Sequence, residues 1–166
     1  LQNLTVVAVE PGQAAIVGNY VSPGYYSLNT SNATDVPVYR VGLNLSKLQK
    51  GFRIIIRVVE KEQLDKSFVV PPLDDIVKYV NATVEGMPEE EIGPIEFGIR
   101  VDKKYGLIES SIAFHRLTSQ WDNINIVKEG EDADYIYYTA YSPGLSIYAI
   151  TGIRAPALAG SIVELP

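Results

Sequence analysis

Residues 135–152, YIYYTAYSPGLSIYAITG, carry five tyrosines and no charged side chain, and a proline–glycine pair at positions 143 and 144 interrupts them. Side chains of an extended strand alternate between two faces. Both halves of this stretch, residues 135–141 and 145–151, are apolar on both faces, which favours the middle of a sheet that is covered on both sides. We therefore predict two central strands joined as a hairpin by the Pro-Gly turn.

The same period of two recurs along the chain, and turns rich in proline or glycine separate the apolar segments. Residues 87–93 alone combine a proline with acidic residues in the manner of a helix start, and we expect one helical turn there at most. The sequence thus predicts a single all-β domain over residues 1–166, an antiparallel β-sandwich of jelly-roll or Greek-key type. Its ten expected strands are residues 4–9, 14–20, 36–43, 52–60, 76–84, 95–101, 110–118, 122–127, 135–141 and 145–151.

Composition excludes several functions. The net charge is −6 and the 14 Lys and Arg residues are scattered, which argues against nucleic acid and against anionic membrane surfaces as partners. There is no cysteine, so disulfides, thiolate metal sites and cysteine nucleophiles are absent. No apolar run approaches the roughly 20 residues of a membrane-spanning helix, and we expect no membrane insertion.

The asparagine residues indicate in which cellular compartment the protein resides. Five of the eight begin an N-x-[ST] triplet, although 18 Ser and Thr in 166 residues would place about one there by chance. The enrichment predicts a secreted, glycosylated chain whose residue 1 is a mature or trimmed start. The alternative is that Asn and Thr simply cluster in turns. The predicted glycosylation sites are Asn3, Asn29, Asn32, Asn44 and Asn81.

Candidates for chemistry are few, and we predict no catalytic residue, no cofactor and no metal. His115 is the only histidine, and no G-x-S-x-G elbow accompanies it. The acidic loop Glu129–Asp134 could bind calcium through carboxylate oxygens, but it lacks the spacing of an EF-hand, so a solvated hairpin loop is the favoured interpretation. Carboxylate pairs for glycoside hydrolysis can be drawn from any acidic protein. Trp121 and the tyrosines could form a sugar-stacking platform, but packing is the favoured interpretation.

Residues 95–152 carry a recognisable order of motifs. An I-x-F-x-x-x-V strand, at Ile95, Phe97 and Val101, precedes an Arg-to-Trp segment at Arg116 and Trp121. An acidic loop, a tyrosine-rich strand and a closing A-x-S-P-G-x-S-x-x-A-I follow. This order resembles the PGF-pre-PGF domain of archaeal cell-surface and S-layer-associated proteins, and a weaker likeness extends back to about residue 52.

The chain departs from the family pattern at Tyr105, Leu145 and Tyr148. Tyr105 stands where another aromatic residue, usually tryptophan, is expected, and the other two replace phenylalanines of the closing motif. These exchanges keep the bulk of the side chain. Because the family has no known active site, the resemblance implies only an extracellular, cell-surface location and a β architecture.

The first ten residues, LQNLTVVAVE, form an apolar strand at the beginning of the sequence. Both of its faces are apolar, so we expect it to be covered on both sides. It can pair within its own domain, or it can fill a gap in a neighbouring copy as a donor strand. The expected contact residues of such a donor strand are Leu4, Val6, Val7, Ala8 and Val9.

The favoured function is therefore a non-enzymatic structural protein of the archaeal cell surface, whose copies polymerise into filaments through this strand. The expected partner is the protein itself, with cell-surface glycans as a further possibility. The alternatives are a carbohydrate-binding, adhesive or S-layer-associated module, and an unrecognised hydrolase. Polymers in the microscope would support the first function, glycan retention the second and pH-dependent turnover the third.

Overall fold

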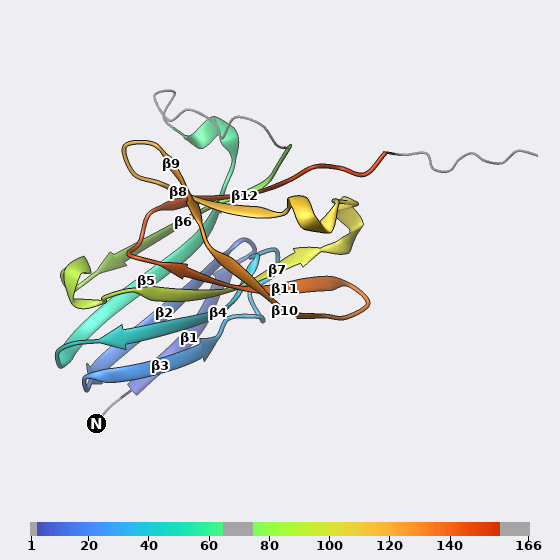
Figure 1. Ribbon diagram of the computed structural model, residues 1–166. Coiled ribbons are helices and arrows are strands. Elements are labelled where there is room, and N and C mark those ends of the chain that lie inside the picture. The colour runs from blue at the N-terminus through green and yellow to red at the C-terminus, as the bar shows by residue number, and fades with distance from the viewer. Residues whose placement is uncertain (1–2, 65–74, 157–166) are drawn as a thin grey trace, which may run out of the picture.

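The computed structural model describes residues 3–64 and 75–156, which form a sandwich of two antiparallel sheets (Figure 1). Hydrophobic side chains from both sheets meet between them in the main core. The seven-stranded sheet has the order β1 (Asn3–Glu10), β2 (Gln13–Val21), β5 (Gln49–Val59), β6 (Asp75–Glu85), β12 (Ile147–Gly152), β8 (Ala113–Leu117) and β9 (Trp121–Ile124). The five-stranded sheet has the order β10 (Ile126–Glu131), β11 (Tyr135–Ser142), β7 (Ile95–Asp102), β4 (Val38–Leu45) and β3 (Gly24–Asn29).

The predicted all-β sandwich is confirmed, and each of the ten predicted strands overlaps an observed one. Two strands escaped prediction. The segment 122–127 is divided at Asn125 into β9 and β10, which belong to different sheets, and β3 was not recognised at all. Pro71-Pro72, one of the proline-rich segments at which the sequence predicts a turn, lies outside the described residues.

Short helical turns are more frequent than the sequence suggested. A single 3-10 turn, Glu89–Glu91, occupies the expected place after Pro88. The limit of one turn was wrong, because the described residues hold three more, at Lys61–Gln63, Lys103–Tyr105 and Glu109–Ser111. Each of these turns is only one turn long and connects two strands. It is therefore too short to produce the repeating pattern of apolar residues by which a helix is recognised in a sequence.

The predicted Pro143-Gly144 hairpin was also wrong. Both flanking strands are central, as expected, but β11 lies between β10 and β7, whereas β12 lies between β6 and β8 in the other sheet. The Pro-Gly segment is therefore a crossover that carries the chain from one sheet to the other. A turn signal marks a reversal of the chain but does not reveal whether the next strand pairs with the last one.

Three aromatic rings form the centre of the core. Tyr148 of β12 stacks on Phe114 of β8 with ring centroids 4.9 Å apart and planes 6° apart. Phe97 of β7 meets the Tyr148 ring edge to face at 5.2 Å. All three side chains are at most 2% exposed, so the two sheets are joined by aromatic packing across the sandwich.

The hydroxyl group of Tyr148 is bound to the crossover itself. It lies 2.8 Å from the Ser142 Oγ and donates to the Gly144 carbonyl. Burial raises the pKa of Tyr148 to about 12, so the phenol keeps its proton at neutral pH and can act as a donor. One side chain thus packs the core and holds the segment between the sheets.

We expect Tyr148→Phe to lower the free energy of unfolding by about 1 kcal/mol, because the ring stays packed while the hydroxyl bonds at the crossover are removed. Tyr148→Ala should lower it by about 3–5 kcal/mol through loss of the ring. Urea unfolding measures both values. Tyr141→Phe is the control, because the Tyr141 side chain is 50% exposed and its hydroxyl loss should have little effect. Equal stability of Tyr148→Phe and the wild type would contradict the anchoring role of the hydroxyl.

Candidate functional site

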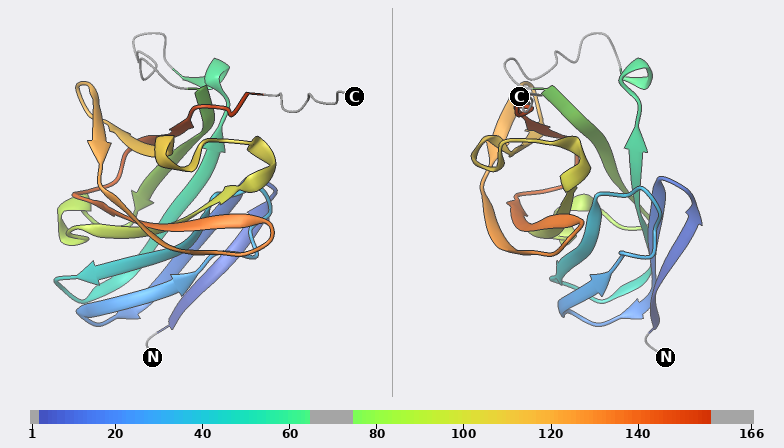
Figure 2. Two further views of the ribbon diagram at one scale, coloured as in Figure 1. Left: turned by 45° about the vertical axis from the view of Figure 1, so that its right-hand side comes forward. Right: turned by 90° about the vertical axis from the view of Figure 1, so that its right-hand side faces the viewer.

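The strand β1 forms one edge of the seven-stranded sheet and pairs with β2 of the same chain (Figure 2). Thr5 lies opposite Val17 and Val7 lies opposite Ala15 in an antiparallel register. Of the predicted donor-strand residues, two face inward and are half-buried against the core, whereas the other three are exposed. The inward pair is Leu4 and Val6, and the exposed residues are Val7, Ala8 and Val9.

The outward face of β1 is therefore open in the single chain, where the sequence had suggested a cover. Val7 is 41% exposed and Val9 is 53% exposed. Among the described residues no strand pairs with the far side of β1, away from β2, because β1 is the last strand of its sheet. An apolar edge of this kind is a template for pairing with another chain.

The other three sheet edges are shorter or carry charges. β9 has four residues, and β3 has six. β10 also has six residues, but its register is broken between Lys128 and Gly130 and three of its side chains are charged. Short strands, bulges and charges each discourage edge pairing. β1 has eight residues and no charged side chain before Glu10, and its register with β2 shifts only after Val7, so it is the longest edge among the described strands.

The turn between β1 and β2 is anchored on one side only. Gly12 has a φ of 82° after Pro11, the combination that a type II turn requires. Its N–H donates to the Thr34 carbonyl and its own carbonyl accepts from the Val58 N–H, both at 2.8 Å. Gly12 is thereby fixed to the body of the domain, while the residues before Pro11 are held by the β1–β2 ladder.

The five predicted glycosylation sites all reach the surface. Asn3, Asn29, Asn32 and Asn44 are exposed, and Asn81 is half-buried. The Asn3 Oδ1 accepts from the Thr5 hydroxyl at 2.9 Å, and the Asn29 Oδ1 accepts from the Ser31 N–H at 2.7 Å. Glycosylation at these five positions stays a prediction.

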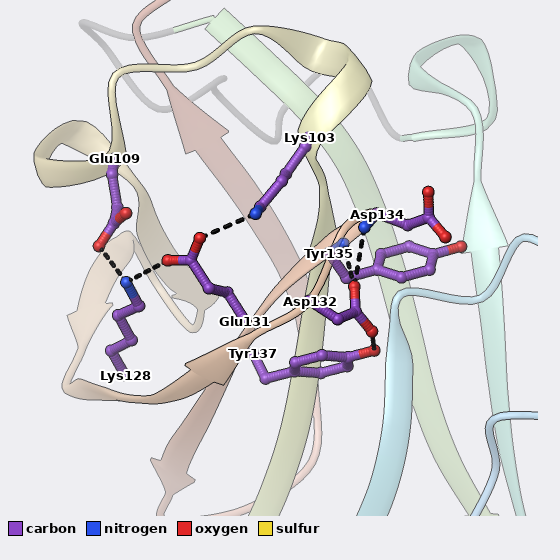
Figure 3. A network of polar contacts seen from close by, with 8 residues as sticks. All are labelled: Lys103, Glu109, Lys128, Glu131, Asp132, Asp134, Tyr135 and Tyr137. Carbon is purple, nitrogen blue, oxygen red and sulfur yellow. Dashed lines mark hydrogen bonds and ion pairs between the residues drawn. The ribbon is translucent and has the colours of Figure 1, made fainter.

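The acidic loop forms bonds with its own neighbours (Figure 3). The Glu131 carboxylate lies 2.8 Å from the Lys103 Nζ and 2.7 Å from the Lys128 Nζ, and Lys128 also reaches Glu109 at 2.9 Å. These two lysines lower the pKa of Glu131 to about 2. Hydrogen bonds to Glu131 and, to a smaller extent, to Glu109 raise the pKa of Lys128.

A second carboxylate of this loop, Asp132, closes the hairpin between β10 and β11. Its oxygens accept from the Tyr137 hydroxyl at 2.6 Å and from the N–H groups of Asp134 and Tyr135 at 2.8 and 2.7 Å. The bond to Asp132 raises the pKa of Tyr137 to about 12. Within residues 3–64 and 75–156, no three His, Cys, Asp or Glu side chains gather as a metal site. Calcium binding at Glu129–Asp134 stays an untested prediction.

Trp121 and the tyrosines do not form a common platform. Trp121 lies on the seven-stranded sheet, half-buried against Val59 and Ala149, with its ring centroid 6.1 Å from that of Tyr79. Tyr148 lies in the core, and the tyrosines of β11 belong to the other sheet.

His115 forms its contact within its own sheet, where its Nε2 lies 2.9 Å from the hydroxyl of Thr151. No helix in the described part of the chain is long and apolar enough to cross a membrane.

Glu131→Gln should make the stability of the fold depend less on pH between pH 5 and pH 2. A carboxylate whose pKa is lowered in the folded state stabilises the fold fully above its ordinary value of 4.5, and this contribution disappears as the pH falls toward about 2. The urea midpoint of the wild type should therefore fall more steeply between pH 5 and pH 2 than that of Glu131→Gln. The difference should shrink in high salt, because the pair is exposed. The surface variant Glu90→Gln serves as control, and parallel curves for all three proteins would contradict the prediction.

Trp121→Ala should lower the free energy of unfolding by about 1–2 kcal/mol, because the indole is half-buried on the outside of the sheet. This is less than the 3–5 kcal/mol that its placement in the core would have implied, and Phe114→Ala should show that larger loss of about 3–5 kcal/mol. Thermal or urea unfolding measures both. A Trp121→Ala protein of unchanged stability that no longer binds glycans would instead identify Trp121 as a ligand contact.

No protein-family model matches the chain, and no curated protein matches it. The resemblance of residues 95–152 to the PGF-pre-PGF domain thus stays a prediction from the motif alone. The site that the structure itself distinguishes is the open edge formed by β1.

Proposed function

We propose that this protein is a secreted, non-enzymatic structural subunit of the archaeal cell surface, and that its copies assemble into filaments by exchange of β1. The assignment to archaea and to the cell surface is supported by the PGF-pre-PGF resemblance and by the five N-x-[ST] triplets. The assembly is supported by one observation: among the described strands β1 pairs with β2 alone, so it can leave the edge of its sheet without parting any other pair of strands.

Exchange replaces each interaction of β1 with the same interaction in a neighbouring copy. When β1 leaves, β2 becomes the edge of the sheet, and the β1 strand of another copy can pair with it in the same register. Leu4 and Val6 then cover the neighbour's core as they cover their own. Because every interaction that β1 gives up within its own chain forms again between chains, such swapping has a small net cost. A head-to-tail exchange does not need to close into a ring, so repetition yields an open filament.

Cysteine pairs can distinguish the two arrangements, since the chain contains no cysteine of its own. Val7 and Ala15 lie opposite each other in the β1–β2 ladder, so their Cβ atoms lie within reach of a disulfide. After assembly and mild oxidation, the double variant Val7→Cys, Ala15→Cys should give a ladder of covalent multiples of the 18.3 kDa chain on a denaturing gel without reductant.

The matched control joins two strands that exchange leaves together. Val17 of β2 lies opposite Arg53 of β5, so Val17→Cys, Arg53→Cys should give only internally bridged monomers. A Val7, Ala15 variant that forms normal filaments but yields only bridged monomers would show that β1 stays in its own chain, and the proposal would be wrong.

Deletion of residues 1–10 tests the same interface from the other side. The shortened protein should fold, fail to polymerise and bind a peptide of sequence LQNLTVVAVE, because the vacated edge of β2 accepts it. Sedimentation measures assembly, and fluorescence anisotropy of the labelled peptide measures binding. A peptide in which Val6 and Val7 are replaced by lysine is the control. Normal filaments from the shortened protein would contradict exchange of β1.

A further inference from the structure

The outward side of the five-stranded sheet carries a cluster of tyrosines, which we name the tyrosine face. Alternation along β11 places Tyr135, Tyr137 and Tyr141 away from the core, whereas Tyr138 faces it. Tyr39 meets the Tyr137 ring edge to face at 5.1 Å. Tyr25 and Tyr141 are the most open members, at 53% and 50% exposed. The tyrosine face consists of Tyr25, Tyr39, Tyr135, Tyr137 and Tyr141.

Two glycines in the central strands keep this face flat. A Cβ at Gly42 would lie 2.7 Å from the Tyr25 Oη, and a Cβ at Gly98 would lie 2.9 Å from the Tyr39 ring. Both distances are too short for real atoms, so each of these tyrosines occupies space that a side chain at the glycine position would need. The Tyr25 hydroxyl therefore lies over Gly42, and the Tyr39 ring lies over Gly98.

The Tyr25 ring is held in this position by its polar end. Its hydroxyl donates to the Glu96 carboxylate at 3.1 Å, across β4 and on β7. The same carboxylate pairs with the Arg40 guanidinium at 3.3 Å. Both charges of this part of the face are thus engaged with each other, and the exposed surface of Tyr25 is aromatic.

A glycosylation triplet stands directly beside this ring. Asn44, of the triplet Asn44-Leu45-Ser46, is the register partner of Tyr25 in the β3–β4 ladder. Asn44 is exposed while Leu45 is 2% exposed in the core, so the Asn44 side chain projects from the tyrosine face. Cβ atoms of directly opposed residues lie about 4.5–5.5 Å apart, which is within the span of one sugar ring.

We propose that the tyrosine face is the docking surface of the protein's own N-linked sugar, and that the first sugar ring on Asn44 lies against the exposed side of Tyr25. This inference rests on the glycosylation that forms part of the proposed function. An aromatic ring is negative on its face, so it attracts the weakly positive C–H groups on one side of a pyranose ring. The sugar hydroxyls on the other side remain in water.

The test uses protein from a host that glycosylates N-x-[ST] triplets, with NMR of the sugar on Asn44. Protons that lie over an aromatic ring shift upfield, so the first sugar should show upfield signals in the wild type and in Tyr25→Phe. In Tyr25→Ala these signals should return to the positions of the free glycopeptide. Tyr25→Phe retains the ring and loses only the bond to Glu96, so it separates stacking from the hydrogen bond.

Stability gives an independent measure of the same interaction. Asn44→Gln should lower the melting temperature by about 2–4 °C in the protein with Tyr25, and by clearly less in the Tyr25→Ala background. Asn32→Gln removes a sugar from a loop and should show no such coupling. Tyr141→Ala removes an equally exposed ring that does not oppose Asn44, and it should leave the Asn44 sugar signals unchanged.

Several results would overturn the inference. One is a sugar on Asn44 whose protons match the free glycopeptide, and another is an Asn44 that carries no sugar. Weaker association between filaments in Tyr25→Ala, with unmoved sugar signals, would make a second copy the occupant. Retention of a free glycan by Asn44→Gln that depends on Tyr25 would make the face a ligand site. Sedimentation of the same preparations measures filament assembly, so failure of assembly is seen separately from loss of the sugar contact.

Discussion

The position of Tyr148 is the constraint on which the sandwich depends. Its ring packs on Phe114 within the seven-stranded sheet and on Phe97 of the five-stranded sheet, while its hydroxyl holds Ser142 and Gly144 at the crossover. The crossover joins β11 and β12, and each of these strands lies between two others. Four neighbouring strands, two in each sheet, therefore take their places from this junction. A side chain that only filled the core could not fix the path of the chain in the same way.

Residues 135–148 are rich in tyrosine because one face of β11 packs in the core and the other lies on the outward side of the sheet. Ile136, Tyr138 and Ala140 face the core, whereas the alternate residues form part of the tyrosine face. Tyrosine suits both environments, because its ring is apolar and its hydroxyl can bind at an edge, as Tyr137 binds Asp132. A charged residue on the inward side would be buried without a partner. The stretch without charge is thus the mark of a central strand, which is what the sequence had indicated.

The sequence predicted the strands better than their partners, and the reason is physical. Alternation along the chain reports which residues share a face, so the ten segments and the central place of β11 and β12 were recognisable. Sheet membership depends on contacts between distant segments, such as Asn81 with Ile147, that no local pattern contains. β3 was missed because its glycine, serine and asparagine read as a turn. The exposed face of β1 and the opposition of Tyr25 and Asn44 both depend on register, which only the structure supplies.

Glycosylation and strand exchange do not obstruct each other, because sugars project from the faces of the sheets whereas exchange takes place at an edge. Side chains leave a strand perpendicular to its sheet, whereas pairing extends the sheet within its plane. Leu4 and Val6 face the core, so Asn3 projects from the outward face of β1 and a sugar there leaves the backbone edge open. Asn44 projects from the opposite side of the sandwich in the same manner. Sugars can therefore cover the faces of every subunit while β1 still pairs with β2 of a neighbour, and a filament built in this way would be coated along its length without losing its joints.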